Sequence, residues 1–202
     1  MPSHISVRRP ARGRVLALAV AFAAAAPAFA APKPAQLTPT FKDRDAPNQA
    51  PKDGKPGCTV HFAEIVDERR SPDVLGVINR RAVLAPKDVQ AWMKAVLGGL
   101  TARGVTAIYE PDSAAAPQIP SARFTLQTAW IQSTVVTYSA SVVVKLKAEG
   151  PAGSAVDQSY RGRVARTAYW SGGTDTLQSA VDGAFADALD AMAGDLKAMC
   201  AA

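Results

Sequence analysis

The sequence predicts an α+β domain, in which two helices pack on one face of a four-stranded, mostly antiparallel sheet. Two segments repeat apolar residues at helical period, and three others alternate apolar with polar residues as strands do. Such alternation is typical of antiparallel sheets with one face in water, so helices must cover the other face. The predicted order is strand-helix-strand-strand-strand-helix, in a single domain at residues 58–202.

The first 30 residues have the pattern of a secretory signal peptide. A start with four arginines precedes an apolar run from Val15 to Ala26, and Ala28-Phe29-Ala30 offers the small residues that a signal peptidase accepts. The apolar run is shorter than the roughly 20 residues that cross a bilayer. We therefore expect cleavage between Ala30 and Ala31, and a mature chain outside the cytoplasm.

The charge of the exported part argues against nucleic acid as a partner. Four of the 23 Lys and Arg residues lie in the first 30 residues, which contain no acid. The rest carries 19 basic against 17 acidic residues, a net charge of only +2. Proteins that bind nucleic acid show a clustered basic face instead.

Residues 31–57 are predicted to form a flexible, extended linker. Six prolines and four lysines are interleaved there, and only Leu37 and Phe41 offer much apolar surface. Proline removes backbone donors, and so little apolar surface does not offset the entropy lost on ordering.

The first strand and the first helix follow the linker. The run from Thr59 to Asp67 is rich in Val, Phe and Ile, which predicts a strand. The charged stretch 68–85 contains an apolar island at 74–78, which is predicted to form either a short hairpin or an irregular loop. From Pro86, which suits a first helical turn, apolar residues recur at helical spacing as far as Gly104, which suits a left-handed cap. Asp88 is expected at the N-terminal end of this helix, where its negative charge is favoured by the positive end of the helix dipole.

Three strands and a second helix complete the domain. At 123–131, the pattern predicts that Phe124, Leu126 and Trp130 face one way, and the alternation is clearer at 135–148 and at 156–170. The helix starts at Thr174 and has an apolar side, with its aspartates predicted on the solvent side. These aspartates are Asp182, Asp187, Asp190 and Asp195.

Cys58 and Cys200 are the two cysteines of the chain. An even number in an exported protein favours a disulfide, and two buried free thiols are the alternative. Cys200 at the end of the last helix could reach Cys58 at the start of the first strand. The closed loop would stabilise the fold by about 4 to 5 kcal/mol in the chain-entropy model.

The sequence shows no motif for catalysis, a cofactor or a metal. His61 is the single histidine after residue 30, and we expect it at the sheet surface rather than in a catalytic triad or a zinc site. Trp92, Trp130 and Trp170 fit core or core-edge positions better than a ligand cage. We therefore expect no cofactor and no enzymatic activity.

The most suggestive cluster is charged. Asp67, Arg69 and Arg70 precede the apolar island, and Arg80 and Arg81 follow it. Guanidinium groups match phosphate and carboxylate, so this loop is the candidate site for a lipid headgroup or an acidic partner surface. The structural alternative, which the pattern favours, is that Asp–Arg pairs fix the loop internally while the island lies against the core.

The layout from Cys58 to Met199 resembles the YajG-like envelope lipoproteins and the related auxiliary components of ABC-type transport systems. The resemblance rests on three groups of segments: Asp67-Glu68-Arg69 with Leu75-Gly76, then Arg103-Gly104-Val105, and then Tyr160-Arg161-Gly162 with Trp170-Ser171-Gly172. It implies a non-catalytic protein that supports a membrane complex. Members of that family carry a lipidated cysteine directly after the signal peptide, whereas this chain reads Ala30-Ala31-Pro32 there.

These expectations favour a non-catalytic periplasmic accessory or binding protein, associated with an envelope assembly or peripherally with the membrane. Two alternatives stay open: a periplasmic hydrolase with an unrecognised site, and a purely structural envelope protein.

Overall fold

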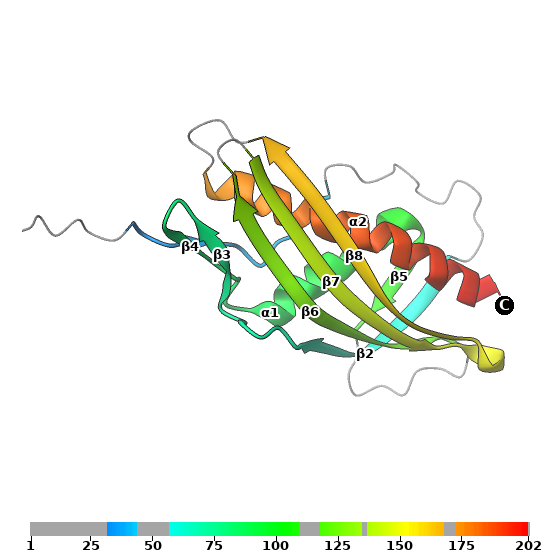
Figure 1. Ribbon diagram of the computed structural model, residues 1–202. Coiled ribbons are helices and arrows are strands. Elements are labelled where there is room, and N and C mark those ends of the chain that lie inside the picture. Colours follow the sequence, from blue (N-terminus) through cyan, green and yellow to red (C-terminus); the bar gives the residue numbers. More distant parts are fainter. Residues whose placement is uncertain (1–31, 44–56, 110–117, 135–136, 168–172, 202) are drawn as a thin grey trace, which may run out of the picture. The chain divides into compact units, whose positions relative to one another are not determined.

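A computed structural model of the 202-residue chain describes residues 32–43, 57–109, 118–134, 137–167 and 173–201 (Figure 1). The predicted signal peptide, Ala30, Ala31 and Trp170 lie outside the described residues. The long elements are strands β2 (Cys58–Asp67), β6 (Ser121–Ser133), β7 (Thr137–Glu149) and β8 (Ala155–Thr167), and helices α1 (Val89–Gly98) and α2 (Thr174–Ala201). The short ones are β1 (Ala35–Gln36), β3 (Val74–Ile78), β4 (Arg81–Leu84), β5 (Val105–Ile108), and the 3-10 turns Thr101–Arg103 and Pro151–Gly153.

The main sheet has five strands in the order β5-β2-β6-β7-β8. The prediction of four strands is wrong, because β5 directly follows the left-handed Gly104 (φ 79°) and is only four residues long, too short for an alternating pattern to show. Strand β2 runs parallel to both of its neighbours, β5 and β6, while β6, β7 and β8 pair antiparallel. The predicted α+β class is confirmed, with a sheet that is mixed.

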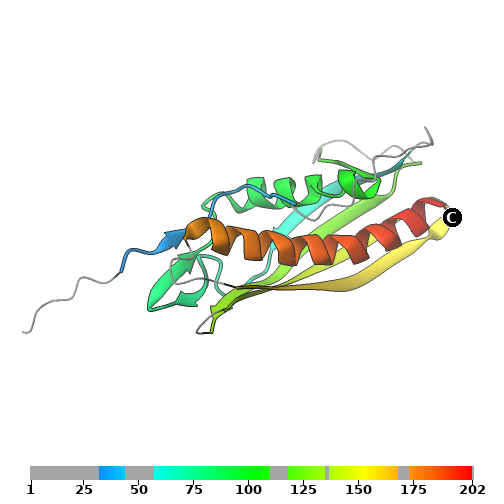
Figure 2. The same cartoon turned by 90° about the horizontal axis from the view of Figure 1, so that it is seen from above.

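Helices α1 and α2 lie on the same face of this sheet, as predicted (Figure 2). Asp88 lies at the N-terminal end of α1, as expected, where it is the N-cap: its carboxylate accepts a hydrogen bond from the backbone N–H of Ala91 at 2.8 Å. Helix α2 lies directly on β8, because a Cβ at Gly162 would come within 1.7 Å of the carbonyl oxygen of Ala184. Neither of the two described α-helices lies on the other face of the β6–β8 part of the sheet.

The apolar island forms a hairpin, one of the two forms left open by the sequence. Strands β3 and β4 pair antiparallel around Asn79 and Arg80, which both have positive φ, as a type I′ turn requires. Strand β1 adds to β4 in parallel, so a second sheet has the order β1-β4-β3. Leu75 is fully buried, which places the island against the core.

The segment 32–43 packs on the domain, although the composition of 31–57 predicts a flexible linker. Leu37 is only 2 % exposed, and the ring of Phe41 lies so close to Gly99 that a Cβ there would come within 2.5 Å of it. The segment also covers Asp182 of α2, which is 2 % exposed and accepts a hydrogen bond from the backbone N–H of Lys42 at 3.2 Å. Asp182 was predicted to face solvent, so the covering segment overturns that placement.

The predicted disulfide between Cys58 and Cys200 is present, with 5.5 Å between the two Cα atoms. It joins the first residue of β2 to the last turn of α2 and so closes the layer of helices onto the sheet. None of the described helices is long and apolar enough to cross a membrane.

Candidate functional site

Trp130 projects from the open face of the sheet, not into the core. The pairing of β6 with β7 shifts by one residue between Leu126 and Thr128, a β-bulge at Gln127. Before the bulge, Phe124 and Leu126 are buried; after it, the buried positions are Ala129 and Ile131, and Trp130 is 46 % exposed. The prediction of an inward Trp130 is therefore wrong.

A signal for this bulge exists in the sequence. Strict alternation from Leu126 would place the polar Thr128 in the core and Ile131 in water. One extra residue at Gln127 corrects both positions at once, and it turns Trp130 outward as a consequence.

A shallow hollow of about 590 Å³ lies beside Trp130 on this open face. Two rows of paired residues cross it, the row Trp130–Ser141–Arg163 and the row Gln132–Ser139–Ala165. The small side chains of Ser139, Ser141 and Ala165 form its floor, and Trp130 and Arg163 flank that floor on β6 and β8. We call these six residues the Trp130 trough.

The basic residues of the open face fall into two groups. Away from the trough, Lys145 binds Asp157 at 2.8 Å and Arg123 binds Glu64 at 3.3 Å. The hydrogen bond from Lys145 lowers the pKa of the Asp157 carboxyl. At and beside the trough, the exposed side chains of Arg161 and Arg163 form no ion pair within the described part of the chain.

The environment of Arg163 leaves its guanidinium group available. Its backbone N–H donates to a carboxylate oxygen of Asp187 on α2 at 2.9 Å. This hydrogen bond satisfies a main-chain donor at the edge of β8, the last strand of the sheet. That contact uses the main chain of Arg163, so the side chain remains directed to the open face beside the trough.

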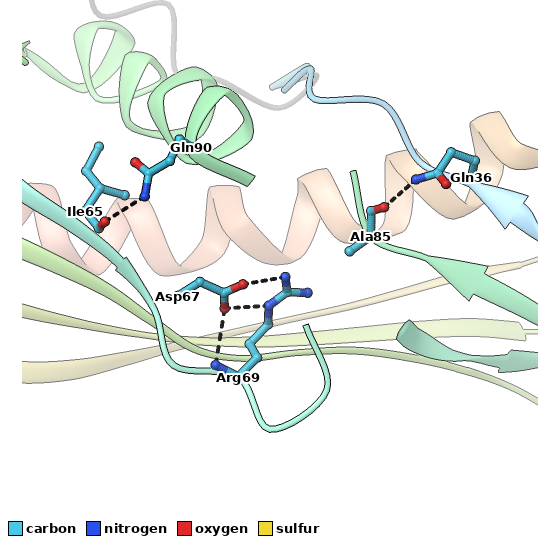
Figure 3. A network of polar contacts seen from close by, with 6 residues as sticks. All are labelled: Gln36, Ile65, Asp67, Arg69, Ala85 and Gln90. Atoms are coloured by element: carbon cyan, nitrogen blue, oxygen red, sulfur yellow. Dashed lines mark hydrogen bonds and ion pairs between the residues drawn. The ribbon is translucent and has the colours of Figure 1, made fainter. Parts of the chain in front are cut away.

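Two of the residues predicted to bind a partner are turned inward. Arg69 donates to both carboxylate oxygens of Asp67 at 2.8 Å, and its side chain is only 3 % exposed (Figure 3). The guanidinium group also lies over the ring of Trp92, 5.8 Å from the ring centroid, as a cation–π contact. Trp92 itself is fully buried, as predicted. Asp67 and Arg69 thus join the end of β2 to α1, which is the structural role favoured above.

The remaining arginines of the predicted cluster lie apart. Arg70 and Arg80 are exposed, and Arg81 is half-buried. Arg70 lies four residues before β3, whereas Arg80 lies in the turn between β3 and β4. The structure therefore does not gather the five predicted residues into one site.

His61 is buried, not at the sheet surface as predicted. It is 4 % exposed and lies in β2, between β5 and β6, where its partners in register are Ile108 and Ser121. The sequence pattern places His61 on the face opposite Val60 and Phe62, but it does not show whether that face is covered. Within the described ranges, no group of three or more His, Cys, Asp or Glu residues is placed to hold a metal ion.

No protein-family model matches the sequence, and no curated protein is significantly similar to it. Solved structures are similar in part. A protein of Xanthomonas campestris is 12 % identical, with a TM-score of 0.46 over 84 % of this chain and 96 % of its own. A lipoprotein of Neisseria meningitidis is 12 % identical, with a TM-score of 0.32 over 61 % and 94 %. Rare lipoprotein B of Shewanella oneidensis is 12 % identical, with a TM-score of 0.32 over 66 % and 89 %.

Proposed function

We propose that this chain is a non-catalytic accessory protein of the bacterial cell envelope, which acts in the periplasm by binding a partner protein through the Trp130 trough. The observation that carries the proposal is the trough itself: an exposed tryptophan, and an arginine that forms no ion pair with the described residues, on either side of a floor of small side chains. Tryptophan and arginine are enriched where proteins bind one another and carry much of the binding energy.

Two further features support the location. The first 30 residues follow the signal-peptide pattern, and the Cys58–Cys200 disulfide requires an oxidising compartment. The resemblance to YajG-like lipoproteins and auxiliary transport components makes a membrane transport assembly the partner to test first.

A hydrolase would need a nucleophile and a base that meet a substrate. His61 is 4 % exposed, which gives a substrate no access to its imidazole. The Trp130 trough, in contrast, is open and lined by serines, a tryptophan and an arginine, a set that suits binding better than proton transfer.

Photo-cross-linking in living cells tests the proposal. A photoreactive amino acid replaces Trp130, and in separate strains it replaces Arg80 at the hairpin tip and Lys197 on α2. We expect one identified envelope protein to be captured from position 130 and not from position 197. Ser141→Leu, which fills the floor of the trough, should abolish the capture, whereas Ser159→Leu on the same face should not, because Ser159 does not line the trough.

Capture from Arg80 alone would overturn the proposal in favour of the hairpin. No capture from any position, with the protein intact in the periplasmic fraction, would overturn it as well.

A further inference from the structure

Arg161 and Arg163 follow each other on the open face beside the Trp130 trough, and neither side chain forms an ion pair with the described residues. Arg161 and Arg163 are successive outward residues of β8, so their Cα atoms lie about 6.6 Å apart. Like charges at this distance destabilise a sheet surface. Lys145 and Arg123 on the same sheet each have a carboxylate at 2.8 and 3.3 Å. Within the described part of the chain, the two arginines thus differ from Lys145 and Arg123, which each have a carboxylate partner.

We propose that the Trp130 trough binds an acidic segment of a protein, with an apolar side chain packed against Trp130 and one or two carboxylates bound to Arg163 and Arg161. The inference rests on the proposed function and specifies the chemistry of its partner. A guanidinium group binds a carboxylate through two parallel hydrogen bonds, which fix the orientation of the carboxylate as well as attract it.

The spacing across the sheet suits such a segment. Trp130 and Arg163 lie in one row, on either side of Ser141, so two strand spacings of about 4.8 Å separate their backbones. Flanking residues whose backbones are about 10 Å apart lie within reach of one extended chain or of one side of a helix, which is about 10 to 12 Å across. In such a segment, an aspartate or glutamate would bind Arg163 while a leucine or phenylalanine a few residues away packs against Trp130.

The form of the site favours a protein segment over a membrane surface. The floor of Ser139, Ser141 and Ala165 is recessed between larger side chains, so an inserted group fills it and a flat lipid surface does not. The face is not broadly basic either, because Asp157 and Glu64 neutralise Lys145 and Arg123. A membrane surface would select a wide basic face, whereas two adjacent arginines beside one tryptophan select a local acidic group.

Calorimetric titration of the mature protein at 0.15 M salt tests this chemistry. The probes are a blocked ten-residue peptide of alternating Leu and Glu, the same peptide with Gln for Glu, and phosphatidylglycerol vesicles. We expect saturable binding of the Glu peptide, weakened at least about tenfold by Arg163→Glu. Lys147→Glu is the matched control, since Lys147 is an exposed lysine on the same face and does not line the trough. It should change the affinity by less than about twofold, because salt screens charges beyond about 8 Å.

Three results would overturn the inference: equal binding of the Gln peptide, binding of the vesicles in place of the Glu peptide, or no binding of the Glu peptide at millimolar concentration. The cross-link from position 130 separates this failure from failure of the proposed function. If Ser141→Leu abolishes the cross-link and Arg163→Glu leaves it intact, the trough binds a partner that is not acidic there.

Discussion

The guanidinium group of Arg103 and the carboxylate of Asp43 form a buried ion pair across 60 residues of sequence. The same guanidinium group donates to Asp190 of α2 at 2.6 Å and to the carbonyl oxygens of Gly99 and Ala186 at 3.0 and 3.1 Å. Arg103 therefore connects three parts of the chain: the N-terminal segment, the end of α1 and the middle of α2. This explains why a segment with the composition of a linker is held on the domain.

Arg103→Met should destabilise the protein by about 3 to 5 kcal/mol, because it leaves the buried carboxylate of Asp43 without a counter-charge. Arg123→Met is the control; Arg123 is 46 % exposed in its ion pair, so its loss should cost less than about 1 kcal/mol. Urea unfolding at pH 7 measures both variants. Equal, small losses would show that Arg103 does not hold the N-terminal segment.

Trp130→Ala should leave the free energy of unfolding within about 1 kcal/mol of the parent, because the exposed indole contributes little to the core. Trp92→Ala should cost about 3 to 5 kcal/mol, since Trp92 is fully buried, packs edge-on to Phe185 and lies under Arg69. Thermal and urea unfolding compare the two. A large loss from Trp130→Ala would mean that Trp130 is part of the core.

Removal of the disulfide through Cys58→Ser with Cys200→Ser should lower stability by roughly 5 kcal/mol, since the bond links residues 142 positions apart and restricts the unfolded chain. The measurement is urea unfolding of the double variant and of the parent with and without reductant. An unchanged unfolding midpoint under reductant would contradict the cross-link.

Two glycines should respond to alanine in opposite directions. Gly162→Ala should cost at least about 2 kcal/mol, because the new Cβ would lie 1.7 Å from the carbonyl oxygen of Ala184 and push α2 off β8. Gly194→Ala should stabilise α2 by up to about 1 kcal/mol, since nothing lies within 4 Å of the added carbon and alanine favours a helix. Tolerance of Gly162→Ala would show that α2 does not pack this closely.

Alkaline pH should weaken the fold through Tyr109. Burial raises the pKa of Tyr109 to about 12 from an ordinary value of 10.0, so the folded state holds this proton more tightly than the unfolded state. The resulting stability is present below pH 10 and is lost as the pH rises toward 12. Unfolding in urea between pH 9 and pH 11.5 should show this decline, and Tyr109→Phe should reduce its slope. An identical slope in the variant would contradict the shift.

Several features depend on neighbours that the local sequence does not reveal. The inward placement of Arg69 needs Trp92 of α1, and the burial of His61 is not visible in the alternating pattern of its strand. Composition averaged over residues 31–57 hid three residues, Leu37, Phe41 and Asp43, that each meet a specific partner on the domain. A segment with few apolar residues can still pack on a domain when each of those residues fits a specific contact there.

The sequence alone predicted the two helices and the three long antiparallel strands, and it favoured the pairing of the two cysteines over free thiols. Periods of 3.6 and 2 arise from backbone geometry within each element, and they can be read locally. The tertiary structure decided the parallel pairing of β2 with β5 and β6, the position of the N-terminal segment and the outward turn of Trp130. The bulge at Gln127 shows the physical reason: one extra residue exchanges the two faces of a strand, and only the paired register with β7 establishes where that exchange occurs.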